Sequence, residues 1–328
     1  MAQDNRILIV GNPVSGNGRG ARLLEAARRN EGAVRSLAAA AAAGDPANWP
    51  IVQTTRGGEW KTEVEAFVKT RGIRTVMAIG GDGTLMEVAA HLYGMRADAD
   101  GLSLVPVPGG RGNDFARAYY GYRLEDGEFW EWAADAAGGA TRRWSRQTLD
   151  LGSANGRVFI NMASIGYGGK VVENAQQRQA FWSKTSAVYQ VEGLLAFAGG
   201  GRGRVDVKVD GESVYTGPFF GAFVGNGKAN GSGLYWTRAA RFDDGKLDAI
   251  VFPKPGLLEM ARSMNAIKST ATPPPDIVMR HKAIQGAEIV FYFDEPVALE
   301  LDGDFVGDAM QHGFKCLAQA LNTWVLKK

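Results

Sequence analysis

Three glycine-rich loops constrain the fold of this chain most strongly, because each follows an apolar run and precedes a helical pattern. The clearest is Gly80–Thr84, which follows the apolar run Thr75–Ile79. From Leu85 onward, apolar residues recur at the i, i+3, i+4 and i+7 spacing of a helix face. Glycine lets backbone approach a phosphate, and Asp82 can hold a cation beside it. The sequence predicts an anion-binding turn at a strand's carboxyl end, with an ordinary tight turn as the alternative.

The first loop, Gly11–Gly20, lies between an apolar run at Arg6–Val10 and a helical stretch. The Walker pattern fails because no Lys-Ser/Thr pair follows the loop's second glycine. The dinucleotide pattern is partly met by Gly16-x-Gly18-x-x-Ala21. A classical NAD site is disfavoured, because no acidic residue ends the next predicted strand, Ile51–Thr55. What remains is a backbone cradle for phosphate around Gly16, with Arg19 as a nearby positive charge.

The third loop, Pro108–Asp114, follows the predicted strand Leu102–Val107 and opens a helix at Phe115. Its last two residues are good helix N-caps, which is their structural interpretation. That interpretation leaves the additional glycines and the arginine of the loop unexplained. Asp114 and Arg117 stand three residues apart on the new helix, where they can form an ion pair.

The order of the predicted elements divides the chain of 328 residues into two domains. Strands and helices alternate up to about residue 120, which predicts a mainly parallel sheet. Beyond the junction, predicted strands follow one another through turns such as Asn155-Gly156 and Asp210-Gly211, which favours antiparallel hairpins. We therefore expect an α/β domain at 1–140 and a β-rich domain at 141–328. Whether the last strand of the chain returns to the first domain is left open.

Seven strands are expected in the second domain: Ser145–Leu151, Arg157–Ser164, Val205–Val209, Phe219–Val224, Lys246–Phe252, Glu288–Phe293 and Val297–Leu301. Helical inserts are expected at Gly169–Phe197 and Gly256–Lys268. Aromatic and aliphatic residues of the first insert, between Phe181 and Phe197, line an entrance for a substrate or pack into the domain.

Composition excludes several classes of function. A net charge of +2 and a pI near 8.6 are too mild to indicate nucleic-acid binding. One cysteine and three separated histidines disfavour a disulfide framework, a zinc site and a Cys-His pair. No apolar run is long enough to span a bilayer, and Met1–Arg6 lacks the apolar core of a signal peptide. We expect a cytoplasmic protein whose acid–base chemistry uses carboxylates.

Three groups of carboxylates stand out in the second domain. Asp150 lies just after the junction, and the turn Asp243–Asp248 carries enough acids for a hard cation. At 299–304, strand alternation puts Glu300 and Asp302 on the face opposite the two leucines. Asp302 is a candidate general base, and a solvated hairpin turn is the simpler alternative.

The motifs together resemble the diacylglycerol kinase catalytic family, which includes bacterial lipid kinases and the sphingosine and ceramide kinases. The resemblance covers about residues 5 to 325. Its motifs are Asn12-Pro13-x-Ser15-Gly16, Gly80–Ala89, Pro108-x-Gly110-x-Gly112-Asn113-Asp114-Phe115-Ala116, Leu149–Gly152, Gly225–Gly227, Asp243-Asp244-Gly245-x-Leu247-Asp248 and Asp302-Gly303.

The resemblance implies transfer of phosphate from ATP to a lipid alcohol such as diacylglycerol, with ATP between the two domains and Mg²⁺ as cofactor. It implies that the first domain is the nucleotide-binding domain and the second the lipid or substrate domain. It also implies that Asp302 is the base and that Asp304 and Asp82 are further catalytic residues. The residues implied to bind ATP are Asn12, Ser15, Gly16, Arg19, Thr54, Gly80, Gly81, Asp82, Gly83, Thr84, Gly110, Arg111 and Asn113. Those implied for the Mg²⁺ network are Asp82, Asp114, Arg117 and Asp150, and those for a structural metal are Asp244, Asp248 and the carbonyl of Lys246.

The sequence departs from the family pattern at several positions. Met86 replaces the usual asparagine, and Arg111 replaces Thr or Ser in the third loop. The lysine that many bacterial members carry in the first loop is absent. Asp304 replaces the family's glutamate, which shortens the side chain by one methylene.

Three functions remain open on these residues. The first is a lipid kinase that contacts the membrane peripherally. The second is a kinase of a soluble hydroxyl acceptor such as NAD, because NAD kinases share the Gly80–Thr84 motif. The third is a non-catalytic nucleotide- or lipid-binding relative. A homodimer formed through edge strands of the second domain also stays open.

Overall fold

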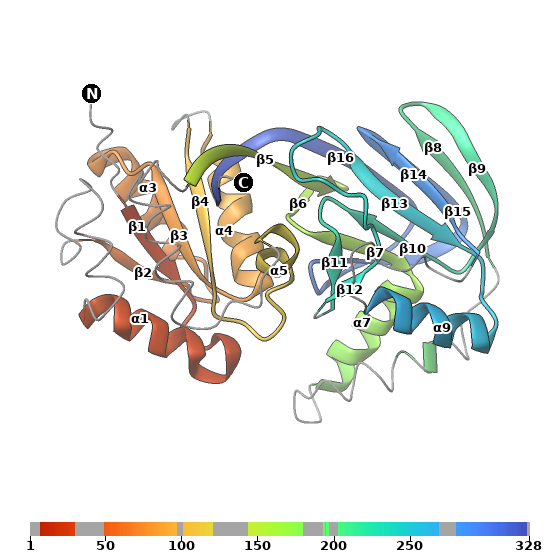
Figure 1. Ribbon diagram of the computed structural model, residues 1–328, viewed down its shortest axis with the longest axis horizontal. Coiled ribbons are helices and arrows are strands. Elements are labelled where there is room, and N and C mark those ends of the chain that lie inside the picture. Colours follow the sequence, from red (N-terminus) through yellow and green to blue (C-terminus); the bar gives the residue numbers. More distant parts are fainter. Residues whose placement is uncertain are drawn as a thin grey trace. The chain divides into compact units, whose positions relative to one another are not determined.

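A computed structural model describes residues 7–29, 49–96, 101–120, 144–179, 193, 195–196, 203–231, 233–268 and 280–326. The chain forms two compact units (Figure 1). Unit 1 contains Met1–Leu149 and Gln319–Lys328, and unit 2 contains Asp150–Ala318. The chain passes from one unit to the other within two strands, β5 (Trp144–Ala154) and β16 (Asp304–Leu326). None of the described helices is long and apolar enough to cross a membrane.

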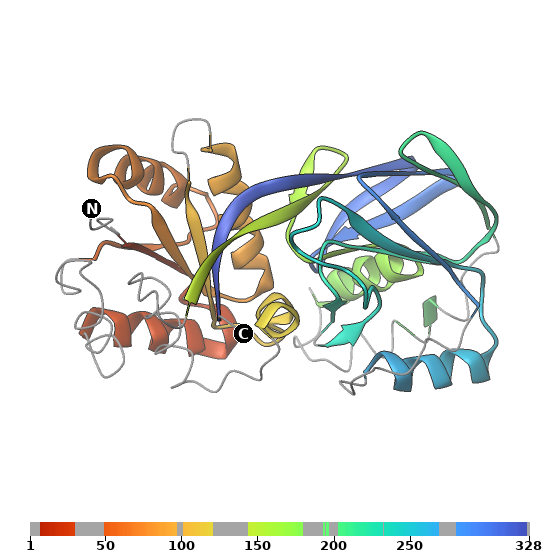
Figure 2. The ribbon, with the colours of Figure 1, turned by 45° about the horizontal axis from the view of Figure 1, so that its top comes forward.

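Unit 1 is built on parallel strands in the order β4-β3-β1-β2. Figure 2 shows α1 on one face of this sheet and α3 and α4 on the other. Because both faces are covered, β1, β3 and β4 are buried along their length. The strands are β1 (Ile7–Gly11), β2 (Ile51–Gln53), β3 (Thr75–Gly80) and β4 (Ser103–Pro108). The helices are η1 (Ser15–Gly18), α1 (Arg19–Arg29), α3 (Trp60–Arg71), α4 (Asp82–Gly94) and α5 (Asp114–Tyr120).

The end of β16 completes this sheet from the far end of the sequence. Asn322 pairs with Ser103 in parallel, so β16 lies beside β4. The hydroxyl of Thr323 donates a hydrogen bond of 2.8 Å to the carbonyl of Leu104. The free edge of β4 is therefore covered by residues of unit 1's second segment.

Unit 2 is an antiparallel structure in the order β14-β13-β10-β7-β15-β16, with β8 and β9 extending from β15. Its other strands are β6 (Arg157–Phe159), β7 (Met162–Gly166), β8 (Gly203–Val209), β9 (Glu212–Phe219), β10 (Gly221–Gly225), β11 (Ala229–Asn230), β12 (Leu234–Tyr235), β13 (Leu247–Phe252), β14 (Lys282–Gly286) and β15 (Glu288–Leu301). Its helices are α7 (Tyr167–Gln179) and α9 (Leu257–Ile267).

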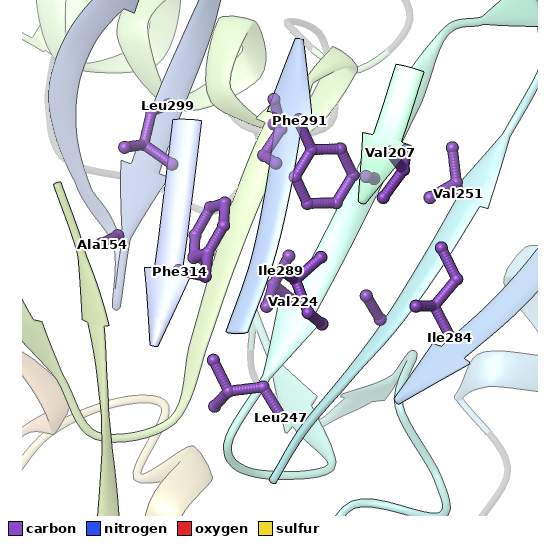
Figure 3. Packing of buried hydrophobic residues seen from close by; sticks show 14 of the residues in the cluster. Ala154, Val207, Val224, Leu247, Val251, Ile284, Ile289, Phe291, Leu299 and Phe314 are labelled. Carbon is purple, nitrogen blue, oxygen red and sulfur yellow. The ribbon is translucent and has the colours of Figure 1, made fainter. Parts of the chain in front are cut away.

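Two hydrophobic clusters hold unit 2 together. The larger lies between its strands and includes Ile289, Phe291 and Phe314, all fully buried (Figure 3). The second is aromatic and lies where α9 and the start of α7 pack on the sheet. In it, the rings of Phe223 and Trp236 stack with centroids 3.9 Å apart. These clusters fix the strand ends and helices that carry the candidate site.

The predicted α/β class, with a mainly parallel region followed by an antiparallel β-rich region, is confirmed. Strands β9, β14 and β16 were not among the seven strands expected, and two further predictions need correction. The expected strand Arg157–Ser164 is divided into β6 and β7. The expected pair Glu288–Phe293 and Val297–Leu301 is one strand, β15, with a shift in register between Tyr292 and Val297. The proposed lipid entrance at Phe181–Phe197 falls mostly outside the described residues.

Candidate functional site

Side chains of the first loop connect the three glycine-rich loops of unit 1. Asn12 follows β1, and its Nδ2 donates to the hydroxyl of Thr84 in α4 at 3.0 Å. The Ser15 hydroxyl is 2.9 Å from the carbonyl oxygen of Asn12 and 3.2 Å from that of Gly109. The loops after β1, β3 and β4 therefore meet at one edge of the sheet, as parallel strands require.

Glycines allow these loops to meet backbone against backbone. A Cβ on Gly110 would lie 2.3 Å from the Cα of Gly81. A Cβ on Gly16, whose φ is +56°, would lie 2.2 Å from the carbonyl oxygen of Gly109. No side chain fits at either contact. The glycines thus produce a backbone surface at the start of α4, where helix amides favour an anion.

Asn113 holds the third loop in shape. Its Oδ1 accepts a hydrogen bond of 2.9 Å from the Gly110 amide, and its Nδ2 donates to the Gly110 carbonyl at 3.0 Å. Its φ is +51°, a conformation that asparagine tolerates better than most residues. Arg111 is exposed on this loop. The loop therefore combines a fixed backbone with an accessible cation.

Two carboxylates begin the helices that follow the second and third loops. Asp82 is the first residue of α4, and its Oδ1 accepts the amide of Phe115 in α5 at 3.1 Å. Asp114 is the first residue of α5, is 6% exposed, and lies 3.8 Å from the Arg117 guanidinium. The expected Asp114–Arg117 ion pair is present. Asp82 is thus bonded to the residue next to Asp114, which brings the two acids to one region.

The remaining predicted nucleotide-binding residues lie in the same unit. Thr54 follows β2, and its amide donates to the carbonyl of Gly11 at 2.9 Å. Arg19 is the first residue of α1 and is half-buried. Gly80 ends β3, and Gly83 lies in the first turn of α4.

In unit 2, the Asp302-Gly303 turn joins β15 to β16. Both residues have positive φ, +48° and +98°, as the primed hairpin turns require. The Asp302 carboxylate does more than a hairpin needs, because it accepts three backbone amides. Oδ2 accepts from Ile160 at 2.7 Å, and Oδ1 accepts from Asn161 at 3.0 Å and Met162 at 2.9 Å. These bonds engage amides at the break between β6 and β7, which explains why the expected single strand is divided.

Glu300 lies beneath this turn and is a residue whose importance the sequence did not reveal. Leu299 and Leu301 are buried as alternation predicts, but Glu300 is only 2% exposed because α7 covers the other face of β15. Its carboxylate accepts the Ser164 hydroxyl and the Gly303 amide. Burial raises the pKa of Glu300 to about 7, and the charge of nearby Asp302 adds to the shift. The feature of the sequence that could have revealed this burial is a single carboxylate between two leucines at the end of a strand.

Asp304 and α7 complete the surroundings of the turn. Asp304 begins β16 and lies opposite Leu301. Gln176 of α7 donates from Nε2 to the Gly303 carbonyl at 3.1 Å and lies 3.5 Å from the Asp304 carboxylate. The turn is therefore held from α7 as well as from β7.

Asp150 is bonded to the acidic turn of unit 2. It is 1% exposed, and its Oδ2 accepts the Gly245 amide at 2.7 Å. The carboxylate of Asp244 accepts a hydrogen bond of 3.1 Å from the backbone amide of Lys246. The carboxylate of Asp248 lies 3.3 Å from the side-chain Nε2 of Gln285. The described residues hold no group of three His, Cys, Asp or Glu side chains placed to share a metal. The metal at Asp244, Lys246 and Asp248 stays a prediction.

Asn226 connects the two carboxylate-bearing parts of unit 2. It is fully buried, and its Nδ2 donates to the carbonyls of Asp150 and Ile160 at 2.9 and 2.8 Å. Ile160 in turn donates its amide to Asp302. The sequence motif contained Asn226 but did not indicate this bridging role, which depends on strands far apart in the chain.

Comparison with known proteins covers both units. Residues 6–148 match the model of the diacylglycerol kinase catalytic domain. Residues 161–325 match the YegS C-terminal NAD kinase beta sandwich-like domain. The fold resembles a crystal structure of a "putative diacylglycerol kinase" from Bacillus anthracis str. Sterne, with a TM-score of 0.69 and 21% identity over 97% of each chain.

Curated relatives agree with the family models. A "Probable lipid kinase YegS-like" protein of Pseudomonas aeruginosa (strain UCBPP-PA14) is 37% identical over 186 residues, which are 56% of this chain and 56% of that protein. One of the same name from Pseudomonas putida is 32% identical over 184 residues, 56% of this chain and 57% of that protein. The chain spans about half the length of the curated relatives it matches. With both of its units matched, the protein belongs to the family that joins a diacylglycerol kinase catalytic domain to a YegS C-terminal NAD kinase beta sandwich-like domain.

Proposed function

We propose that the protein is an ATP- and Mg²⁺-dependent kinase that phosphorylates the hydroxyl of a lipid alcohol such as diacylglycerol. The observation that carries the proposal is the backbone surface where Gly81 meets Gly110 at the start of α4. Phosphate oxygens need amide donors and close backbone approach. The N–H groups at the start of α4 supply such donors, and the glycines allow the approach. Arg19 and the exposed Arg111 supply positive charge on the flanking loops.

Asp302 acts as the base in this proposal. Its carboxylate takes the proton of the lipid hydroxyl, the oxygen forms a bond to the γ-phosphorus, and the bond from that phosphorus to the bridging oxygen of ADP breaks. The three amides from Ile160, Asn161 and Met162 fix the orientation of the carboxylate. Glu300 and Gln176 position the turn by bonding to Gly303.

A magnesium ion on unit 1 is part of this proposal. Mg²⁺ prefers carboxylate oxygens and retains several waters. Asp82 and Asp114 would hold it, since they begin two helices that a hydrogen bond joins. When bound, the ion would neutralise charge on the transferring phosphate. Asp150 is the third acid that we propose for this network.

The test is incubation of the purified protein with γ-labelled ATP, Mg²⁺ and a panel of lipid alcohols in mixed micelles, with NAD as the soluble acceptor. We expect label in a lipid and none in NAD. Label in NAD alone would mean that the protein is a kinase of a soluble acceptor and would overturn the proposal. ATP binding without label in any acceptor would make the protein a non-catalytic binder and point to Met86, Arg111 and Asp304.

A further inference from the structure

Helix α9 exposes two neighbouring leucines in its first turn. Leu257 is 72% exposed and Leu258 is 63% exposed, more than any other large hydrophobic side chain described in unit 2. Single exposed apolar residues are ordinary on a protein surface, but an adjacent pair at this exposure indicates a contact site. The chemistry surrounding the pair decides which partner it fits.

The inner face of α9 is already anchored, so the leucines cannot turn inward. Met260, Met264 and Ile267 pack against the aromatic cluster that contains Trp236. The Glu259 carboxylate accepts the Gly256 amide at 2.8 Å and caps the helix start. The outward position of the leucines is therefore a fixed property of this helix.

Positive charge accompanies the leucines. Arg262 is exposed on the same helix, four residues after Leu258 and thus on its face, and Lys268, which directly follows the helix, is also exposed. Lys282 of β14 is exposed and pairs with Val251, near the end of the strand that leads into α9. Glu259, which serves as the cap, is the only carboxylate among residues 253–268 and 280–282. We call Leu257, Leu258, Arg262, Lys268 and Lys282 the α9 surface.

We propose that the α9 surface docks the protein on a membrane that contains anionic lipids. Leucines enter the interface between headgroups and acyl chains, while the cations meet anionic headgroups. Two leucines are too little apolar area for a stable protein–protein interface, which favours a bilayer as the partner. The inference deepens the proposed function, because a lipid acceptor resides in a membrane.

The position of α9 within unit 2 agrees with this role. Helices α7 and α9 lie on the same side of the unit's strands in both ribbon views (Figures 1 and 2). Helix α7 also bonds to the Asp302 turn through Gln176 and Gly303. Docking through α9 would therefore turn one side of the unit 2 sheet toward the membrane. That side carries α7, the helix that bonds to the Asp302 turn.

The test measures binding of the full chain to phosphatidylcholine vesicles with and without phosphatidylglycerol, by co-sedimentation in the absence of ATP. We expect Leu257→Ser/Leu258→Ser to weaken vesicle binding on the order of tenfold. Arg262→Gln/Lys268→Gln should weaken binding only to vesicles with phosphatidylglycerol and reduce its dependence on salt. The matched control is Val214→Ser/Met310→Ser, which removes two exposed apolar side chains elsewhere in unit 2 and should bind as the wild type does.

Activity separates this inference from the proposed function. The leucine variant should keep its activity on a short-chain, water-soluble diacylglycerol and lose it on vesicles. Absence of activity on every acceptor defeats the proposed function, whereas the vesicle data still decide docking. The inference is overturned if wild type does not bind vesicles, if the leucine variant binds equally well, or if the leucine changes alter the oligomeric state instead.

Discussion

Unit 1 and unit 2 hold their candidate functional groups in opposite ways. In unit 1, backbone meets backbone at Gly81 and Gly110, where no side chain has room. In unit 2, a single carboxylate, Asp302, gathers three amides from the break between two strands. The first arrangement should fail when atoms are added, and the second when an oxygen or its charge is removed. Four substitutions test that difference.

Asp302→Asn should have the largest effect. The substitution removes the proposed base. It also places an amide NH₂ opposite backbone N–H groups that need an acceptor. We therefore expect kinase activity to fall by roughly 10²–10⁴-fold. ATP affinity, which the proposal assigns to unit 1, should stay unchanged. The measurement is kcat together with ATP binding.

Asp210→Asn is a closely matched control for that change. Asp210 also precedes a glycine, has a φ of +50°, and accepts a backbone amide, that of Glu288, at 2.8 Å. We expect it to leave kcat unchanged. Equal losses of kcat in both variants would mean that Asp302 is only a turn residue.

Gly110→Ala should act on unit 1 alone. The added Cβ would lie 2.3 Å from the Gly81 Cα, so the two loops must separate and ATP binding should weaken about tenfold or more. Gly94→Ala, at the end of α4, meets no atom within 4 Å and should bind ATP normally. Isothermal titration with ATP measures both. If the Gly110 variant binds ATP normally, the contact between these glycine loops does not form the phosphate-binding surface that we propose.

Glu300→Gln should change the pH dependence of stability. The pKa of Glu300 is 4.5 in the unfolded chain and about 7 in the folded protein, so folding favours the protonated form. Its stabilising contribution is full below about pH 4.5 and is lost as the pH rises to about 7, at a cost of about 3 kcal/mol. Glutamine is always neutral, can accept the Gly303 amide and can donate to Ser164.

The measurement is urea unfolding of wild type and Glu300→Gln across this pH range. The variant should be the more stable protein above pH 7, and the difference should shrink toward pH 4.5. Glu288→Gln, whose carboxylate is exposed beside Lys315, is the control and should follow the wild-type profile. Parallel profiles for wild type and the Glu300 variant would show that the buried carboxylate does not titrate in this range.

Asn12→Ala should have the smallest effect. It removes the partly buried hydrogen bond between the first loop and Thr84, worth about 1 kcal/mol, and an exposed one that the Val14 amide donates to Oδ1. We expect a rise in the KM for ATP of a few fold with kcat unchanged. Thr70→Ala removes an exposed hydrogen bond on α3 and should not change KM. A fall in kcat for Asn12→Ala would assign that residue a role beyond joining the loops.

The sequence was most informative where a structure depends on neighbours in the chain. Apolar runs followed by glycines predicted the strand–loop–helix units around Gly16, Gly80 and Gly110, because burial and positive φ are local demands. The Asp210-Gly211 and Asn155-Gly156 hairpins were predicted for the same reason, and the register of their strands confirms them.

Features that depend on distant segments were not predicted. The break at Ile160–Asn161 exists because Asp302, 140 to 142 residues away, takes the amides of that segment. The burial of Glu300 depends on α7, and alternation along one strand does not show whether its second face is covered. Strand β14 was missed because five of the seven residues in 280–286 are exposed and its pattern is mostly polar.

The return of β16 to β4 has a consequence for synthesis and for genetic dissection. Its hydrogen bonds to Leu102 and Leu104 join residues 220 and 219 positions apart. A ribosome releases the whole of unit 2 before the strand that covers β4 is made, so the edge of β4 waits unpaired while the rest of the chain emerges. A fragment that ends at Leu149 would keep that exposed edge permanently, and we expect it to aggregate. Expressing unit 1 alone would require a permuted gene in which residues 319–326 are fused to its first segment.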